Sequence, residues 1–124
     1  MRLLLALLLV STLASAAVAD ECAAGTDMAA ARFYVGTAQH VPAINRLKIV
    51  LTKYSSAGHA PEALAQIAES FLALGAASEA QTAAAVLDRK FSGTRWSVQA
   101  RALLASAALV PRENERSWIS QAFR

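Results

Sequence analysis

From residue 27 to the end of the chain, apolar residues recur at spacings of three and four rather than two. This is the period of an α-helix that buries one face. The pattern predicts an all-α protein with five helices, over about residues 27–37, 41–54, 60–75, 77–90 and 94–109. The side chains expected to face the core in the first three are Met28, Ala31, Tyr34 and Val35, then Ile44, Leu47, Leu51 and Tyr54, then Leu64, Ile67, Ala68 and Phe71.

Residues that begin and end helices fall at the expected boundaries. Asp27 is a suitable N-cap for the first helix, because its carboxylate can accept hydrogen bonds from the first turn. Pro42 and Pro61 suit the first turns of the second and third helices, where a backbone N–H is not needed. Residues 91–93, Phe-Ser-Gly, predict the turn between the fourth and fifth helices.

The chain resembles itself at an offset of 37 residues. Small, aromatic and aliphatic residues match in the same order, in the pairs Ala31 and Ala68, Tyr34 and Phe71, Ala43 and Ala80, Val50 and Leu87, Tyr54 and Phe91, and Ser55 and Ser92. Ala105 continues the series as the start of a third copy. The order resembles the tetratricopeptide repeat and predicts about two and a half antiparallel helix-hairpin repeats. An ordinary four- or five-helix bundle is the alternative.

The C-terminal tail predicts a short sixth helix. It follows Pro111 and places Trp118, Ile119, Ala122 and Phe123 on one face. If this face packs on the last repeat, it caps the end of the repeat array, which otherwise exposes apolar surface. If it stays free, it is an apolar anchor for a partner. We expect it to be a capping helix.

The first 19 residues have the three parts of a secretory signal peptide. Arg2 supplies the positive charge, residues 3–10 are apolar, and the small residues that end at Ala19 form a cleavage site, with Ala16 as the second choice. An uncleaved N-terminal anchor is the alternative. The sequence therefore predicts a signal peptide over residues 1–19, a flexible leader over 20–26 and a repeat domain over 27–124.

Cys22 follows the expected cleavage site closely, as the lipidated cysteine of a bacterial lipoprotein would. A lipoprotein signal needs a leucine-like residue three positions earlier and a small residue directly before the cysteine, and here these positions hold Ala19 and Glu21. We therefore expect Cys22 to be unlipidated. As the single cysteine of the chain it cannot form an internal disulfide.

Charge and composition argue against two classes of function. The chain has 12 basic and 9 acidic residues, and the basic ones are scattered, which does not favour nucleic acid as a partner. His40, His59 and Cys22 have neither the spacing of a metal site nor an arrangement suited to nucleophilic catalysis. We expect no enzyme activity, cofactor or metal, and we expect both histidines to be solvated turn residues.

A few side chains stand out as candidates for binding another protein. Asn45 and Arg46 lie beside the expected core face of the second helix, where the guanidinium could reach a carboxylate of a partner. A pairing of Arg46 with a neighbouring acid such as Glu69 is the alternative. Trp118 and Phe123 are the candidates in the tail, whereas Trp96 is expected to pack in the core.

Several strings are more specific than the repeat. They are residues 27–34, 41–51 (VPAINRLKIVL), 61–64 (PEAL), 69–75 (ESFLALG), 79–80 and 84–87 (AAVL), with the closing residues 116–124 (RSWISQAFR). These resemble the C-terminal repeats of the BamD family of outer membrane assembly lipoproteins. The resemblance implies a periplasmic protein at the inner face of the outer membrane, held there by its partners, which would be a BamA-like component and associated lipoproteins.

Two departures from that family bear on the implied function. Only two repeats and the tail are matched, where the family has about five repeats, and the lipid-attachment motif is absent. The resemblance therefore implies a docking module without the family's own anchor. The alternatives are a general periplasmic adaptor serving the Tol-Pal or a secretion system, a non-functional truncated paralogue, and a small exported enzyme or its inhibitor.

Overall fold

The computed structural model describes residues 2–54 and 58–124, with side chains from residue 18 on. Within these residues the secondary structure is entirely helical, as predicted. The six helices are α1 (Arg2–Gly36), α2 (His40–Lys53), α3 (Ala60–Ala73), α4 (Ala77–Lys90), α5 (Arg95–Ser106) and α6 (Trp118–Gln121). Ser55, which was predicted to match Ser92, lies outside the described residues, as does the turn that contains it.

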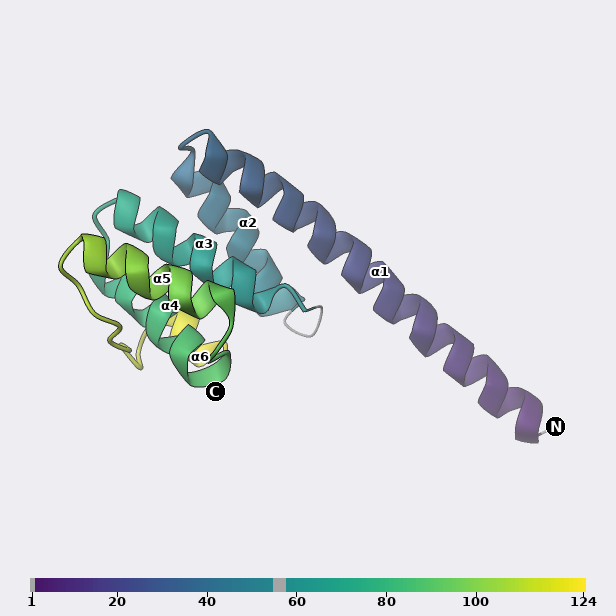
Figure 1. Ribbon diagram of the computed structural model, residues 1–124. Coiled ribbons are helices and arrows are strands. Elements are labelled where there is room, and N and C mark those ends of the chain that lie inside the picture. The colour runs from purple at the N-terminus through teal and green to yellow at the C-terminus, as the bar shows by residue number, and fades with distance from the viewer. Residues whose placement is uncertain (1, 55–57) are drawn as a thin grey trace.

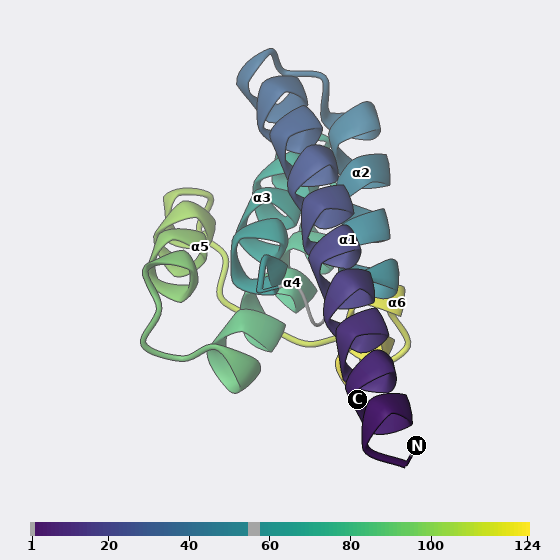
Figure 2. The same ribbon diagram turned by 90° about the vertical axis from the view of Figure 1, so that its right-hand side faces the viewer.

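The first four helices form two antiparallel hairpins, and α5 and α6 follow them (Figure 1). α1 pairs with α2, and α3 pairs with α4, while α3 also packs against α2 and α5. In the view of Figure 2, the first hairpin stands on one side of α3 and α5 stands on the other. This is the stacking expected of about two and a half helix-hairpin repeats, and it confirms the predicted fold class.

The small residues of the repeat lie where the helices of a hairpin meet. Ala31 and Ala43 in the first hairpin and Ala68 and Ala80 in the second are all fully buried. Because an alanine adds only one methyl group, the two helix backbones can approach closely at these positions. Val50 and Leu87, the aliphatic pair of the repeat, are fully buried too. The pattern at offset 37 therefore reflects packing, as predicted.

The same backbone cap ends α1, α3 and α5. At the end of α1 the N–H of Gln39 donates to the carbonyl of Tyr34, and the N–H of Ala38 donates to that of Val35. This pair of bonds is a Schellman motif, which requires a left-handed residue. That residue is Ala38 (φ 58), Gly75 (φ 78) or Ala108 (φ 59) in the three helices. Each cap turns the chain sharply toward the segment that follows the helix.

The third copy does not keep the offset of 37, so the prediction for Ala105 was wrong. Ala105 is exposed. The left-handed residues lie 37 positions apart from Ala38 to Gly75 but 33 apart from Gly75 to Ala108. The connection before α5 (residues 91–94) is two residues shorter than the connection before α3 (residues 54–59), and α5 itself is two residues shorter than α3. Together these differences account for the four missing residues.

α1 is much longer than predicted. It runs unbroken from Arg2 to Gly36, so Asp27 lies inside the helix and is not its N-cap. Residues 20–26, for which we predicted a flexible leader, are helical as well, and Ala24 is fully buried. Alanine-rich sequence has high helix propensity, which lets the helix continue through this stretch. The N-terminal part of α1 projects beyond the other helices (Figure 1).

The C-terminal helix caps the array, as predicted. α6 packs against α4, and Ile119 is fully buried in the core. Ser117 is the N-cap, and its hydroxyl accepts a hydrogen bond from the N–H of Ile119 at 3.2 Å. Trp118 and Phe123 are partly buried against the same core. α6 therefore closes the apolar surface that α4 would otherwise expose.

Candidate docking surface

The outer face of α2 is formed by the residues opposite its core face. Ala43, Leu47, Val50 and Leu51 are buried, whereas Asn45, Arg46, Lys48 and Ile49 are exposed. Both sets follow from the helical period of 3.6 residues. We call the exposed set, together with Trp118 of α6, the α2–α6 surface. It holds three of the four residues that the sequence singled out for partner binding.

Arg46 is paired within the chain, but with a different acid from the one considered. Its Nη1 donates to Oδ1 of Asp27 on α1 at 3.0 Å, and not to Glu69. The side chain of Arg46 remains 45% exposed, while that of Asp27 is 13% exposed. Since a guanidinium has five N–H groups, a contact through one nitrogen leaves donors free for a further carboxylate. The pairing holds Arg46 on the surface and still leaves it available.

Lys48 joins α2 to the C-terminal cap. Its Nζ lies 4.9 Å from the centre of the Trp118 ring, within the range of a cation–π contact. This contact places Trp118 at the Lys48 edge of the exposed face, whereas Arg46 lies at the edge next to α1, where it contacts Asp27. The structure thus brings together two residues that lie 70 positions apart in the sequence. Lys48 and Ile49 were not predicted as site residues, although their spacing from Asn45 places them on the same helix face.

Phe123 lies apart from this group. Its ring makes an edge-to-face contact with Phe91 at the end of α4, with 6.0 Å between ring centres. The partial burial of Phe123 against the core shows that its main contacts are within the chain. Trp96 is also partly buried against the core, as predicted, and the guanidinium of Arg95 covers its ring at 4.2 Å.

A segment between α5 and α6, which we call the strap (residues 110–117), holds the cap against α4. The N–H of Arg112 donates to the carbonyl of Gln81, and the N–H of Asn114 donates to Oγ1 of the buried Thr82 at 3.0 Å. Ser117 donates to Oε2 of Glu79 at 2.8 Å. Backbone and side chains of α4 therefore satisfy the polar groups of a segment that has no regular structure.

Charged hydrogen bonds fasten the strap and cap. Arg89 of α4 donates through Nη2 to Oε1 of Glu113 at 2.8 Å and through Nε to Oε2 at 3.2 Å. Ser120 donates to the same carboxylate at 2.7 Å. The hydrogen bonds from Arg89 lower the pKa of Glu113 despite its partial burial. The carboxylate is thus kept charged, which keeps both oxygens available as acceptors.

A second arginine–carboxylate pair joins the two hairpins. Arg32 of α1 donates through Nε and Nη2 to the two oxygens of Glu62 on α3, each at 2.7 Å. These bonds lower the pKa of Glu62, and they outweigh the opposite effect of burial. Such a two-bond pair fixes direction as well as distance. It therefore sets how α1 lies against α3.

The two histidines are not simply solvated, which corrects the expectation for them. Nδ1 of His40 lies 3.2 Å from the hydroxyl of the buried Ser70, and Nε2 of His59 lies 3.1 Å from Glu21. Each begins or caps a helix and links it to another. Cys22 is exposed. Among the described residues no three acidic, histidine or cysteine side chains are grouped as a metal site would require.

The described part of the chain has no helix that is both long and apolar enough to span a membrane.

Comparison with known proteins identifies related sequences over most of the chain. The model of the YfiO family, described as outer membrane lipoprotein, matches residues 14–113. The outer membrane protein assembly factor BamD of Caulobacter vibrioides is 40% identical over 88 residues, 71% of this chain and 29% of the relative. BamD of Rickettsia prowazekii is 34% identical over 73 residues, 59% of this chain and 29% of the relative.

The chain thus spans less than a third of the length of these two curated relatives. No solved structure matches it significantly.

Proposed function

Because the chain belongs to the YfiO family of outer membrane lipoproteins, we propose that it is a docking module in the assembly of outer membrane β-barrel proteins. It works by binding a protein component of the assembly machinery through the α2–α6 surface, without catalysis. The relatives at 34% and 40% identity are named as assembly factors, which supports this choice among the possible roles of a repeat protein.

The main support for the proposal is that Arg46 is held in place within the chain and is still exposed. Its side chain is held by Asp27 through a single nitrogen and is nearly half exposed. An arginine positioned in advance loses less conformational entropy on binding than a free one, so more of its interaction energy contributes to affinity. Its unused donors suit a carboxylate on the partner.

The neighbours of Arg46 complete a surface of mixed character. Asn45 adds an amide that can donate and accept hydrogen bonds, and Lys48 adds a second positive charge. Ile49 adds exposed apolar area, and Trp118 is half-buried at the edge. Aromatic and arginine side chains dominate binding energy in protein interfaces, which suits Arg46 and Trp118. The partner face should therefore be acidic with an apolar centre.

The proposed location follows from the proposed export signal. Residues 1–19 direct the chain across the inner membrane and are removed after Ala19 or Ala16, and Cys22 is not lipidated. The module then lies in the periplasm and reaches the inner face of the outer membrane through its partner, a BamA-like barrel assembly component with associated lipoproteins.

Affinity capture tests the proposal. The full chain, with a C-terminal tag, is expressed in its host and recovered from detergent-solubilised envelopes, in parallel with Arg46→Glu and Arg46→Gln. We expect the wild type to retain the barrel assembly component, Arg46→Gln to retain on the order of a tenth as much, and Arg46→Glu to retain none. The Arg46→Gln variant removes the positive charge without placing a glutamate beside Asp27, where repulsion between the two carboxylates would itself disturb the surface.

The matched control is Arg101→Glu, since Arg101 is an exposed arginine that pairs with Asp88 and belongs to α5, which lies across α3 from the first hairpin (Figure 2). It should retain the partner as the wild type does. Equal capture by wild type and Arg46→Glu would contradict the assigned face. Capture of other envelope systems, and never of the barrel assembly component, by a folded wild type would contradict the assembly role and favour a general adaptor.

A further inference from the structure

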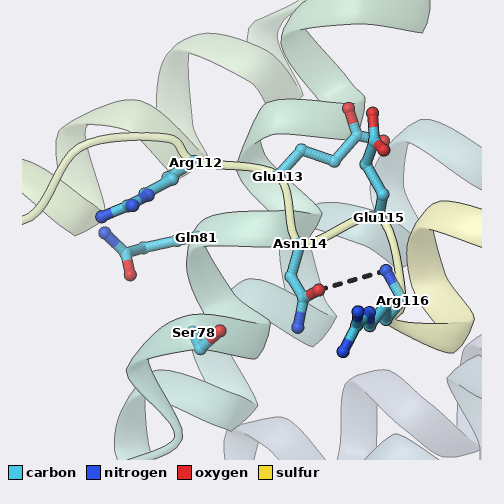
Figure 3. Close-up of a pocket in the computed structure, with 7 residues that line it drawn as sticks. All are labelled: Ser78, Gln81, Arg112, Glu113, Asn114, Glu115 and Arg116. Atoms are coloured by element: carbon cyan, nitrogen blue, oxygen red, sulfur yellow. Dashed lines mark hydrogen bonds between the residues drawn. The ribbon is translucent and has the colours of Figure 1, made fainter.

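The strap forms one wall of a pocket of 620 Å³ that shares no residue with the α2–α6 surface and that the docking proposal does not use. Ser78 and Gln81 of α4 line the opposite wall, and residues 112–116 of the strap, which include Glu113 and Glu115, line the other (Figure 3). All seven residues are partly or well exposed. The chemistry of the pocket is set by how the strap distributes its charges.

The strap turns its acids and its bases to different sides. In Figure 3 the carboxylates of Glu113 and Glu115 turn to one side of the strap, and the guanidinium groups of Arg112 and Arg116 turn away from them. The acids are used by partners in the chain, Arg89 for Glu113 and Arg124 for Glu115.

The bases have no such partners. Within residues 18–54 and 58–124, Arg112 and Arg116 form no ion pair, whereas Arg32, Arg46, Arg89, Arg101 and Arg124 each do. The remaining polar groups of the pocket add donors. Oδ1 of Asn114 accepts from the N–H of Arg116, which leaves the Nδ2 amide hydrogens free to face a ligand. The hydroxyl of Ser78 is a further donor.

We propose that this pocket binds a carboxylate side chain of an acidic peptide segment. An unpaired guanidinium group matches a carboxylate, which accepts through both oxygens. The guanidinium groups of Arg112 and Arg116 point to different ends of the pocket (Figure 3), so a segment with two acids can engage both. The strap's own acids, which also line the pocket, argue against a broad anionic surface as the ligand. Glu115 is 79% exposed, and its charge repels a membrane or polyanion that approaches as a plane but not one side chain that enters the pocket.

The site is independent of the docking surface proposed above, because it uses none of the residues of that surface. It can therefore be tested whether or not Arg46 contacts a partner. The probe is the peptide acetyl-Gly-Glu-Gly-Glu-Gly-amide, and its counterpart with both glutamates replaced by glutamine is the neutral control. Inorganic phosphate and vesicles of phosphatidylcholine with phosphatidylglycerol serve as the other anions.

The measurement is an NMR titration of the isotopically labelled full chain. We expect the glutamate peptide to shift the side-chain amide signals of Asn114 and the backbone signals of Ser78 and Gln81, and the glutamine peptide to shift none. The double variant Arg112→Gln with Arg116→Gln should weaken binding on the order of tenfold or more. The matched variant Lys53→Gln with Lys90→Gln loses the same charge elsewhere and should change it less than about twofold.

Three results would overturn the proposal. The glutamate peptide could leave the pocket signals unchanged in a folded wild type. The two double variants could weaken binding equally, which would mean general charge attraction. Phosphate or the anionic vesicles could shift the pocket signals as strongly as the peptide, which would assign the pocket to those anions.

Discussion

At the scale of single residues, the least expected feature is an alanine in a left-handed conformation at two of the three equivalent helix caps. Glycine has no side-chain penalty in this conformation, whereas an L-residue with a Cβ costs about 1–2 kcal/mol there. Gly75 meets this requirement, but Ala38 and Ala108 do not. The glycine at 75 could be read as a helix stop from the sequence, and the two alanines gave no such signal.

Replacing either alanine by glycine should therefore stabilise the protein. We expect Ala38→Gly or Ala108→Gly to raise the free energy of unfolding by about 0.5–1 kcal/mol in urea denaturation, since the loss of strain exceeds the entropy gained by the unfolded chain. Gly75→Ala should lower it by about 1 kcal/mol, and this cost is due to the backbone because a Cβ at Gly75 meets no atom within 4 Å.

Ala29→Gly is the matched control, because Ala29 is an exposed residue in the interior of α1. A glycine there should destabilise by about 1 kcal/mol. If all the glycine substitutions destabilise alike, the assigned cap geometry is wrong.

Local chemistry explains which single residues could be predicted. The prolines at 42 and 61 lie in the first turns of α2 and α3, as their backbone preference requires. The partners of Arg46 and of the two histidines could not be predicted, because all three contacts join different helices and depend on the way these pack. Asp27 was assigned a local role as N-cap, but in the structure it serves a long-range one.

At the scale of elements, the strap shows how a segment without regular structure is held. Its acid Glu113 accepts two hydrogen bonds from Arg89 and one from Ser120, and its pKa is lowered by Arg89. The folded state therefore binds a proton at this group less readily than the unfolded chain does. Stability from this group is present above about pH 4.5 and is lost as the pH falls through the lowered pKa.

The variant Glu113→Gln tests this link. At pH 7 we expect it to lower the free energy of unfolding by about 1–2 kcal/mol, since it weakens hydrogen bonds to a charged group. The difference from wild type should shrink at pH 3, where the wild-type carboxylate is itself becoming protonated. Urea denaturation at both values measures it.

Glu115→Gln should change stability by less than about 0.5 kcal/mol at either pH, because Glu115 is largely exposed. A difference for Glu113→Gln that is the same at pH 7 and pH 3 would contradict a role for its charge.

The elements divide into those that a repeating pattern encodes and those that it does not. α2, α3 and α4 were predicted closely, because the buried alanines and the aliphatic pair recur with the helical period. α5 begins where predicted, but it is shorter than the first helices of the other repeats, which moves Ala105 to the surface. The long α1 was missed because the residues before Asp27 were interpreted by their resemblance to a cleavage site.

At the scale of the whole molecule, the cap completes the core of an incomplete array. α5 has no second helix to pair with in the described chain, and α6 with the strap lies on α4 instead. Each repeat contacts only its neighbours, so an exposed end lowers the stability of the whole array. The capping role was predictable from the apolar face of the tail, but the path of the strap was not, since its polar contacts have no periodicity.

Loss of the apolar contact that the cap makes should therefore lower the stability of the whole chain. We expect Ile119→Ala to lower the free energy of unfolding by about 2–4 kcal/mol, because Ile119 is fully buried. Val110→Ala, at a site where the side chain is 67% exposed, should change it by less than about 0.5 kcal/mol. Thermal unfolding followed by circular dichroism compares them. Equal effects would mean that α6 does not stabilise the array.

The most direct test of the proposed function locates the partner on the surface of the molecule. A photo-cross-linking amino acid replaces Asn45 on the α2–α6 surface or, as control, Val98 on the exposed side of α5, and the full chain is irradiated in living cells. We expect a cross-link to the barrel assembly component from position 45 and none from position 98. A cross-link from position 98 alone, or from neither position in a chain shown to be folded and exported, would contradict docking through this surface.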